Sequence, residues 1–374
     1  MSPARDRADG TMTQLAVAAE GVELTYADGT RAVAGVDLEV PRGEFFGFLG
    51  PNGAGKTTTI KTMASLLSPT AGQLEINGFD VTESPRKVRQ SIGYMAQETS
   101  VDPEMTAEEN LRFACEAYGV PRGERQTRID ELLDLVDLAE VADKRSEGFS
   151  GGMMKRLDAA TALVHAPPLV FLDEPTTGLD PKARNRLWAY FRELNAAGTT
   201  VFLTTQYLEE ADQLCERLSV IVGGRIVATG SPEELKREVG GEILDIELSA
   251  DQAARDRAIA VVEESTLFEP DATIEETPTG ISVTSRQARE RGPDLLVALR
   301  DAGHEVVGFN VRAPTLDDVF LAITGEELAA WPWAASEAAV EAEQSGLRPR
   351  PMRRALPRSR PSSASRTASS VTCG

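Results

Sequence analysis

The regular pattern of the chain begins with two segments, 15–26 and 33–40, in which apolar and polar residues alternate. A period of two places successive side chains on opposite faces, as in paired strands that are buried on one side. Asp28 and Gly29 lie between the two segments, and Asp-Gly is a common turn dipeptide. The pattern therefore predicts an antiparallel β lobe at the start of the folded chain.

Two short runs, 45–49 and 169–172, are almost entirely apolar. Such runs are typical of strands buried on both faces in a parallel sheet that helices cover. The first run leads into a glycine-rich loop and a predicted helix at 56–67, and the second ends in Asp173 and Glu174. Because ligands bind at the carboxyl ends of strands in such sheets, both loops are candidates for one site.

Beyond residue 234 the pattern predicts a small β-α-β-β-α-β module at about 241–325. Its expected strands are 242–248, 271–276, 281–284 and 305–311, and its expected helices are 252–264 and 294–302. The module contains no constellation of acids, nucleophiles or metal ligands. We interpret it as a dimer-stabilising or regulatory appendage, with inert packing as the alternative.

Both ends of the chain have the composition of tails. Residues 1–14 mix charged and small residues and lack the apolar stretch of a secretory signal. Residues 344–374 contain seven arginines, no acidic residue and many Ser and Pro, a composition that cannot bury a core. We expect both tails to be disordered, and the basic one either touches anionic lipid or is inert.

Composition narrows the function classes. The length of 374 residues favours a main domain plus an appendage. The net charge of −20 repels phosphates, so no nucleic acid is expected as a partner. Cys115, Cys215 and Cys373 are odd in number and widely spaced, which fits a reducing cytoplasm. No stretch reaches the roughly 18 apolar residues of a membrane span, so the chain is not expected to cross a membrane.

The glycine-rich loop matches the phosphate-loop template G-x-x-x-x-G-K-[ST], between a strand and a helix. Its residues are Gly50, Pro51, Asn52, Gly53, Ala54, Gly55, Lys56 and Thr57, with Thr58 next. Glycines allow successive N–H groups to point at phosphate oxygens. We expect Lys56 to contact the β and γ phosphates of ATP and the Thr57 hydroxyl to bind Mg²⁺.

The two acids after the second apolar run suit the same chemistry. Asp173 would hold Mg²⁺, directly or through water, while Glu174 would polarise a water in line with the γ phosphate. A strand that ends in Asp-Glu most often marks a solvated loop. Together with the phosphate loop, however, the catalytic interpretation is favoured.

The segment Phe149, Ser150, Gly151, Gly152 and Met153 resembles the signature sequence of ABC transporters, which usually has Leu first and Gln fifth. Its hydroxyl and N–H groups can open a helix and face phosphate. On these motifs the chain is identified as a member of that superfamily. The resemblance implies an α/β P-loop ATPase with an antiparallel β lobe, a RecA-like parallel core and a helical subdomain.

Three further segments follow the order of the family. Tyr26 resembles the aromatic residue that stacks on adenine, although it could simply be a half-buried strand residue. Gln97 resembles the glutamine of the Q-loop, which also binds Mg²⁺, or it could be a surface amide. The D-loop is matched by Gly178, Leu179 and Asp180.

One position departs from the family. The segment 203–212 resembles the switch segment, which normally has His where this chain has Gln206, and neither His165 nor His304 can substitute by position. A neutral amide donates hydrogen bonds but takes no proton near pH 6.5. We expect Gln206 to donate to the γ phosphate while Glu174 remains the base. A nucleotide sensor with weak turnover is the alternative.

The resemblance covers 15–236, with a helical part at 86–166 and a groove for a membrane subunit near 97–105. In the family, the phosphate loop of one subunit faces the signature of another, so ATP lies between two copies arranged head to tail. The chain is therefore expected to pair with itself or a homologue. It would act on the cytoplasmic face of the cell membrane, held there by a permease.

Two segments, 204–208 and 314–325, resemble the daunorubicin-resistance type of ATP-binding subunit. That likeness implies a drug exporter with a separate permease of the ABC-2 class. Two alternatives are a superfamily ATPase of DNA maintenance or translation and a regulatory ATPase not coupled to transport. The first usually carries long coiled-coil insertions, for which the spacing from Gly50 to Asp173 leaves no room. The second would need a damaged site, and Lys56, Thr57, Asp173 and Glu174 are intact.

Overall fold

The structure is a computed structural model, and it describes residues 14–248, 252–265, 267–270 and 272–324. The expected tails, apart from residue 14, and Cys373 lie outside the described residues. The other two cysteines, Cys115 and Cys215, are buried and free. No helix in the described part is long and apolar enough to span a membrane.

The predicted antiparallel lobe is confirmed. Strand β1 pairs with β2 across the expected turn, where Gly29 has a φ of 89° and donates to the Tyr26 carbonyl at 2.9 Å. The lobe is a four-stranded sheet in the order β2-β1-β4-β5. Its strands are β1 (Leu15–Thr25), β2 (Arg31–Pro41), β4 (Ala71–Ile76) and β5 (Phe79–Asp80).

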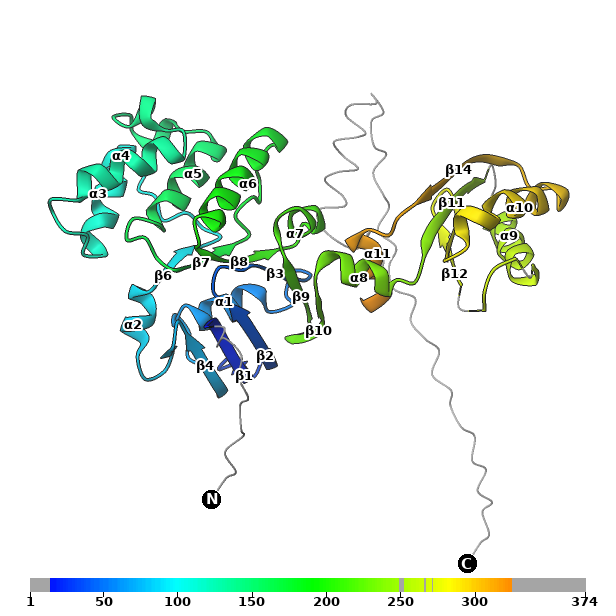
Figure 1. Cartoon of the computed structure of the whole chain (residues 1–374), viewed down its shortest axis with the longest axis horizontal. Helices are drawn as coiled ribbons and strands as arrows, with labels where there is room; N and C mark the ends of the chain where they lie inside the picture. Colours follow the sequence, from blue (N-terminus) through cyan, green and yellow to red (C-terminus); the bar gives the residue numbers. More distant parts are fainter. Residues whose placement is uncertain (1–13, 249–251, 266, 271, 325–374) are drawn as a thin grey trace, which may run out of the picture. The chain divides into compact units, whose positions relative to one another are not determined.

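The two apolar runs are strands of a central six-stranded sheet, as predicted, in the order β10-β9-β3-β8-β7-β6. All neighbours are parallel except β9 and β10. Because β3 and β7 both flank β8 in parallel, their carboxyl ends meet at one edge (Figure 1). The strands are β3 (Phe45–Leu49), β6 (Ile92–Met95), β7 (Leu169–Asp173), β8 (Thr200–Thr205), β9 (Arg217–Val222) and β10 (Arg225–Gly230).

The core joins the two sheets around helix α1 (Lys56–Met63). Phe202 is its aromatic centre, with ring centroids 5.4 Å from Phe46, 5.7 Å from Phe48 and 5.4 Å from Phe171. All four side chains are buried. This packing fixes the strands that carry the phosphate loop and the two acids relative to each other.

Helix α1 ends four residues before the predicted end at 67. Ser65 takes a left-handed φ of 55°, and the Leu66 N–H bonds back to the Lys61 carbonyl at 2.8 Å. A left-handed residue followed by such a bond is a common helix stop. The apolar pattern continued past this stop, which is why the sequence predicted a longer helix.

The region expected to be helical, 86–166, also contains strand β6, which pairs with β7 in the central sheet. The larger helices of the region therefore follow β6. Its helices are α2 (Pro85–Gln90), α3 (Ala107–Ala117), α4 (Arg125–Leu135) and α5 (Gly151–Thr161). Helices α6 (Pro181–Ala196), α7 (Leu208–Leu214) and α8 (Pro232–Glu238) follow in the chain.

The C-terminal module has the predicted β-α-β-β-α-β order, and its antiparallel sheet runs β12-β13-β11-β14. Helix α10 starts at Ala288, whereas the sequence predicted a start at 294, directly after Pro293. The helix contains Pro293 in its interior, so the proline does not mark its beginning. A final helix, α11 (Leu316–Thr324), follows. The other elements are β11 (Glu242–Leu248), α9 (Gln252–Glu264), β12 (Thr273–Thr277), β13 (Gly280–Ser285), α10 (Ala288–Asp301) and β14 (Val306–Arg312).

Replacing Phe202 by Ala is expected to destabilise the fold by about 3–5 kcal/mol, because it leaves a cavity among three aromatic rings. Urea denaturation of the full chain measures this change. The control is Phe113→Ala, since Phe113 is 64% exposed and should change stability by less than about 0.5 kcal/mol. Equal stabilities of the two variants would contradict the central role of Phe202.

Candidate nucleotide-binding and hydrolysis site

The phosphate loop connects β3 to α1 and leaves a cavity of about 230 Å³. Gly55 has a φ of 105°, and a Cβ there would lie 2.3 Å from the Ala32 carbonyl oxygen, so only glycine fits. Gly50 and Ala54 do not line the cavity. Its lining residues are Ala32, Pro51, Asn52, Gly53, Gly55, Lys56, Thr57, Thr58, Gln97 and Glu174.

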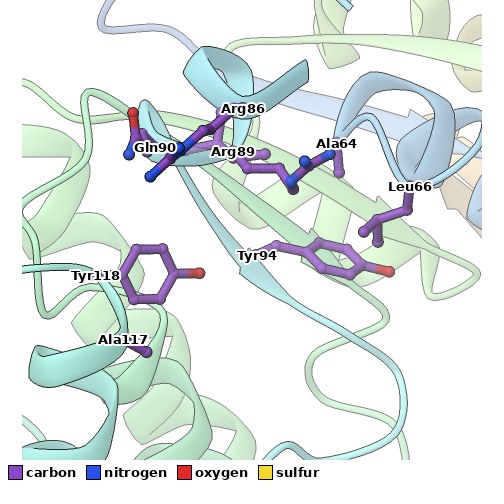
Figure 2. Close-up of a pocket in the computed structure, with 9 residues that line it drawn as sticks. Ala64, Leu66, Arg86, Arg89, Gln90, Tyr94, Ala117 and Tyr118 are labelled. Atoms are coloured by element: carbon purple, nitrogen blue, oxygen red, sulfur yellow. The ribbon is translucent and has the colours of Figure 1, made fainter.

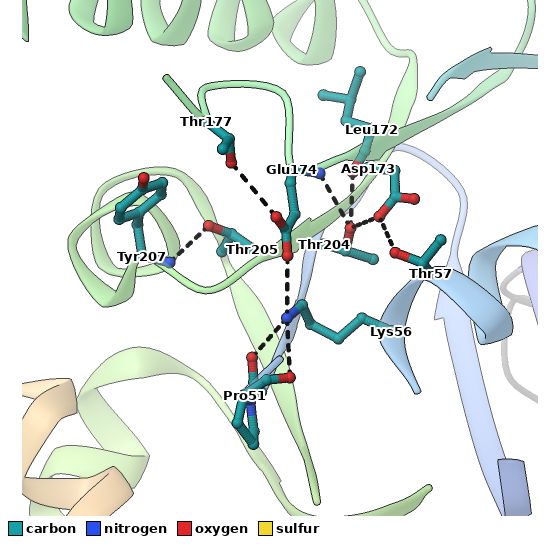
Figure 3. A network of polar contacts seen from close by, with 11 residues as sticks. Pro51, Lys56, Thr57, Leu172, Asp173, Glu174, Thr177, Thr204, Thr205 and Tyr207 are labelled. Atoms are coloured by element: carbon teal, nitrogen blue, oxygen red, sulfur yellow. Dashed lines mark hydrogen bonds and ion pairs between the residues drawn. The ribbon is translucent and has the colours of Figure 1, made fainter. Parts of the chain in front are cut away.

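Lys56 is almost fully buried at the base of this cavity. Its ammonium donates to the carbonyls of Gly50 at 2.7 Å and Pro51 at 3.2 Å, and forms an ion pair with Glu174 Oε1 at 3.2 Å (Figure 3). Burial lowers the pKa of Lys56, and the charge of Glu174 opposes that shift. The cation is thus held in place by backbone oxygens and one carboxylate.

Asp173 is fully buried, and only one of its two carboxylate oxygens has hydrogen-bond partners among the described residues. Its Oδ1 accepts from the hydroxyls of Thr204 at 2.6 Å and Thr57 at 3.2 Å (Figure 3). Its Oδ2 has no hydrogen-bond partner among the described residues, and burial raises the pKa of the carboxyl. A cation at this position would satisfy the free oxygen and favour the ionised form.

Asp173 and Thr57 fit the Mg²⁺ expected from the sequence, because a carboxylate and a hydroxyl are oxygen ligands of the kind that the ion takes. In the described part, no group of three His, Cys, Asp or Glu side chains could hold a metal by itself. The remaining positions would therefore fall to phosphate oxygens, to water and, as expected from the sequence, to Gln97, which is among the residues that line the cavity.

Glu174 has an unusual backbone. Its φ of 49° is left-handed, which costs a residue other than glycine about 1–3 kcal/mol. The conformation is held by its own N–H, which donates to the Thr204 carbonyl at 3.0 Å. It turns the side chain towards Lys56 and the cavity (Figure 3). Strain of this kind, stabilised by neighbours, is frequent where a side chain has a functional role.

Gln206 directly follows β8, next to the strand that carries Asp173. Its side chain is buried, and its Oε1 has no hydrogen-bond partner in the described part. Gln206 is not among the residues that line the cavity. The structure therefore brings Lys56, Glu174 and Gln97 together at the phosphate loop, while Gln206 follows the adjoining strand without lining the cavity.

Tyr26 is 41% exposed, and its hydroxyl shares a hydrogen bond of 3.0 Å with the Thr58 hydroxyl. This bond places the ring beside the start of α1, although Tyr26 does not line the cavity. Gln97 is exposed, and its backbone carbonyl accepts from the Lys155 ammonium at 2.8 Å. That contact ties the segment after β6 to helix α5.

The signature segment opens helix α5, as the sequence indicated. The Ser150 hydroxyl accepts from the Met153 N–H at 3.3 Å and caps the helix. Asp180 caps α6 in the same way, with Leu179 and Gly178 just before it. A second cavity of about 170 Å³ is lined by Ser150, Gly152, Met153, Arg156, Asp180, Lys182, Ala183 and Arg186. It shares no lining residue with the cavity at the phosphate loop.

Thr204 was missed by the sequence reasoning. It donates the shortest hydrogen bond to Asp173, and both its carbonyl and its hydroxyl oxygen accept from the Glu174 N–H. The only signal in the sequence was a polar residue directly after the apolar run 201–203. The structure shows that every residue of this strand is buried. A buried hydroxyl needs a partner, and here that partner is the acid on the neighbouring strand.

Comparison with known proteins places this site in a family. A family model described as "ABC transporter" matches residues 33–177, and one described as "ATP-binding protein DrrA1-3-like, C-terminal domain" matches residues 230–324. The chain is 42% identical to the daunorubicin resistance ATP-binding protein DrrA3 of Streptomyces coeruleorubidus, over 84% of this chain and 98% of that protein. It belongs to the ABC transporter ATP-binding subunits of the daunorubicin-resistance type.

Other relatives agree. The daunorubicin/doxorubicin resistance protein DrrA of Streptomyces peucetius is 43% identical, over 84% of this chain and 94% of that protein. The linearmycin resistance protein LnrL of Bacillus subtilis is 35% identical, over 83% and 98%. A solved dimeric cassette bound to ADP and phosphate has a TM-score of 0.54 and 28% identity, and covers 57% of this chain and 98% of that chain. This ABC subunit is therefore an ATPase, with the fold expected from its sequence.

Gly55→Ala is expected to weaken nucleotide binding at least about tenfold, because the new methyl group would collide with the Ala32 carbonyl and distort the phosphate loop. Titration with a fluorescent ATP analogue measures the change. Gly43→Ala is the control, since Gly43 also has a left-handed φ, of 81°, but has open space around it. If both variants lost binding, the cause would be strain from a left-handed φ in general rather than the collision at Gly55.

Proposed function

We propose that two copies of this chain, arranged head to tail, hydrolyse ATP to drive export of a drug or antibiotic through a separate membrane permease. The observation that carries the proposal is the division of the site into two cavities without a common residue. The phosphate loop and Glu174 line one cavity, and Ser150 and Asp180 line the other. In a head-to-tail dimer, the second cavity of one copy would close the first cavity of the other. The names of the relatives support drug resistance as the outcome.

For hydrolysis, the γ phosphate takes the place of Glu174 as the partner of Lys56. Glu174 is then free to accept a proton from the attacking water, whose oxygen bonds to the γ phosphorus as the bond to the β-γ bridging oxygen breaks. ADP and phosphate are the products. Thr57 and Asp173 would hold Mg²⁺, which neutralises charge on the β and γ phosphates.

Glu174→Gln is expected to lower ATP turnover by about 10²-fold or more, because an amide cannot accept the proton of the water. ATP should then accumulate in a stable dimer, detected by size-exclusion chromatography with and without ATP. EDTA should abolish wild-type turnover if Mg²⁺ is required. The control is Glu98→Gln, an exposed acid near Gln97. Turnover at the wild-type rate in Glu174→Gln would remove Glu174 as the base.

Gln206 donates an amide hydrogen bond to the γ phosphate in this proposal. Gln206→Ala should therefore lower kcat by about tenfold. Gln206→His should retain more activity than Gln206→Ala and add a pH dependence near the ordinary histidine pKa of about 6.5. Steady-state kinetics from pH 5.5 to 8.5 test both variants. If Gln206→Ala matches wild type, the residue has no role at the γ phosphate.

The permease would dock at a third cavity, of about 470 Å³, in the region of α2, β6 and the end of α3 (Figure 2). None of its lining residues belongs to the segment 97–105 that the sequence indicated, and Tyr94 lies three residues before that segment. Arg86, Arg89 and Gln90 lie on one side of it, while Leu66, which is 51% exposed, offers an apolar contact. Its chemistry suits a short cytoplasmic segment of an ABC-2 permease that carries an acidic and an apolar residue. Docking there would hold the chain at the cytoplasmic face of the membrane.

Arg86→Glu is expected to abolish drug resistance in cells that also produce the permease, because it repels an acidic docking segment. ATP hydrolysis by the purified chain should stay within about twofold of wild type. Lys87→Glu is the matched control, since Lys87 lies on the same helix but does not line the cavity. Retained resistance in Arg86→Glu would contradict this docking site. Turnover that never responds to the permease would favour a regulatory ATPase.

A further inference from the structure

A carboxylate without solvent access lies behind the hydrolysis site. Glu210 is in the first turn of α7 and has an exposed fraction of 0%. Its Oε1 accepts hydrogen bonds from the Trp188 indole N–H at 2.9 Å and the Thr176 hydroxyl at 3.0 Å. Burial raises the pKa of the Glu210 carboxyl, and the hydrogen bonds from Trp188 and Thr176 oppose that shift.

The charge of Glu210 is not paired by a cation within 4 Å among the described residues. Arg184, the nearby cation of α6, forms its ion pair with the neighbouring Glu209 at 3.1 Å and lies over the Trp188 ring at 5.1 Å. Glu210 Oε2 is also buried without a hydrogen-bond partner in the described part. Burying a carboxylate costs several kcal/mol unless polar groups compensate. Packing alone would be served better by an apolar side chain.

The donors to Glu210 come from the segments that carry the hydrolysis chemistry. Thr176 lies two residues after Glu174, and Glu210 itself lies four residues after Gln206 in the switch segment. Trp188 is on α6, the helix that Asp180 caps. The D-loop, 178–180, therefore has one donor to Glu210 before it and another after it. One carboxylate connects the loop of the base, the D-loop and the switch segment.

We propose that Glu210 is a positioning residue for ATP hydrolysis, which holds the Glu174 loop, the D-loop and Gln206 in a single arrangement. This inference rests on the proposed function, because it assumes that Glu174 and Gln206 act on ATP. Glu210 itself is fully buried and does not line the cavity at the phosphate loop. It acts through Thr176 and Trp188, so its removal should slow the chemical step and leave ATP affinity nearly unchanged.

The test uses three variants of the full chain that each disturb the contact differently. Glu210→Gln keeps an acceptor oxygen but replaces the other oxygen by a donor. Trp188→Phe keeps the ring and removes only the N–H, and Thr176→Val keeps the shape and removes only the hydroxyl. A misplacement of about 1 Å can cost roughly 10²-fold in rate, so we expect kcat to fall about tenfold in each variant. The affinity for a fluorescent ATP analogue should stay within about twofold.

A double-mutant cycle separates positioning from ordinary destabilisation. If Thr176 acts through Glu210, Thr176→Val should cost less in kcat in the Glu210→Gln background than in the wild type. Glu209→Gln is the matched control, because Glu209 is adjacent on the same helix but has a side chain that is 63% exposed. Its kcat should stay within about twofold of wild type. Thermal melting of every variant defines a temperature at which all remain folded for the assay.

Wild-type kcat in folded Glu210→Gln, Trp188→Phe and Thr176→Val would overturn the inference and leave Glu210 a role in stability alone. Additive losses in the cycle would also overturn it, because they would show that Thr176 and Glu210 act separately. The proposed function fails differently: wild type would then show no turnover, and Glu174→Gln would not form an ATP-bound dimer. In that outcome the positioning role falls with it.

Discussion

A buried ion pair between Lys56 and Glu174 is the interaction around which the site is organised. Neither charge could remain in a cavity lined by the phosphate loop without the other, because an isolated buried charge costs far more than a paired one. The pair exists only because β3 and β7 lie on either side of β8 and end at the same edge. The aromatic packing around Phe202 maintains that arrangement.

Within the pair, the two buried charges compensate each other. Lys56 has two backbone carbonyls and Glu174 as partners. Phosphate oxygens would replace these partners when ATP binds, and the carboxylate would then become available as a base. Asp173, with one oxygen bound and one free, provides the complementary place for a cation. In the proposed function, phosphate would replace Glu174 beside Lys56, and a metal would bind the free oxygen of Asp173.

A second layer of hydrogen bonds surrounds these charges. Thr204 connects Asp173 to the backbone of Glu174, and Glu210 connects the following loop to the switch segment and to α6. Buried carboxylates are costly to place, and the neutral donors fix the one oxygen of each that they reach. Rigidity at this position suits a reaction that depends on the placement of a single water. The division of the site into two cavities adds the requirement for a partner.

The sequence by itself determined the elements whose patterns are local. The strands at 15–26 and 45–49, the phosphate loop and the helix that Ser150 caps follow from periodicity and short motifs, which depend on neighbouring residues. Tertiary structure decided the rest. Helix α1 stops at Met63 through a left-handed Ser65, β6 joins the sheet inside a stretch expected to be helical, and α10 begins before Pro293. The partners of Asp173 and Glu210 are 22 to 116 residues away in the chain, and no local pattern encodes contacts at that separation.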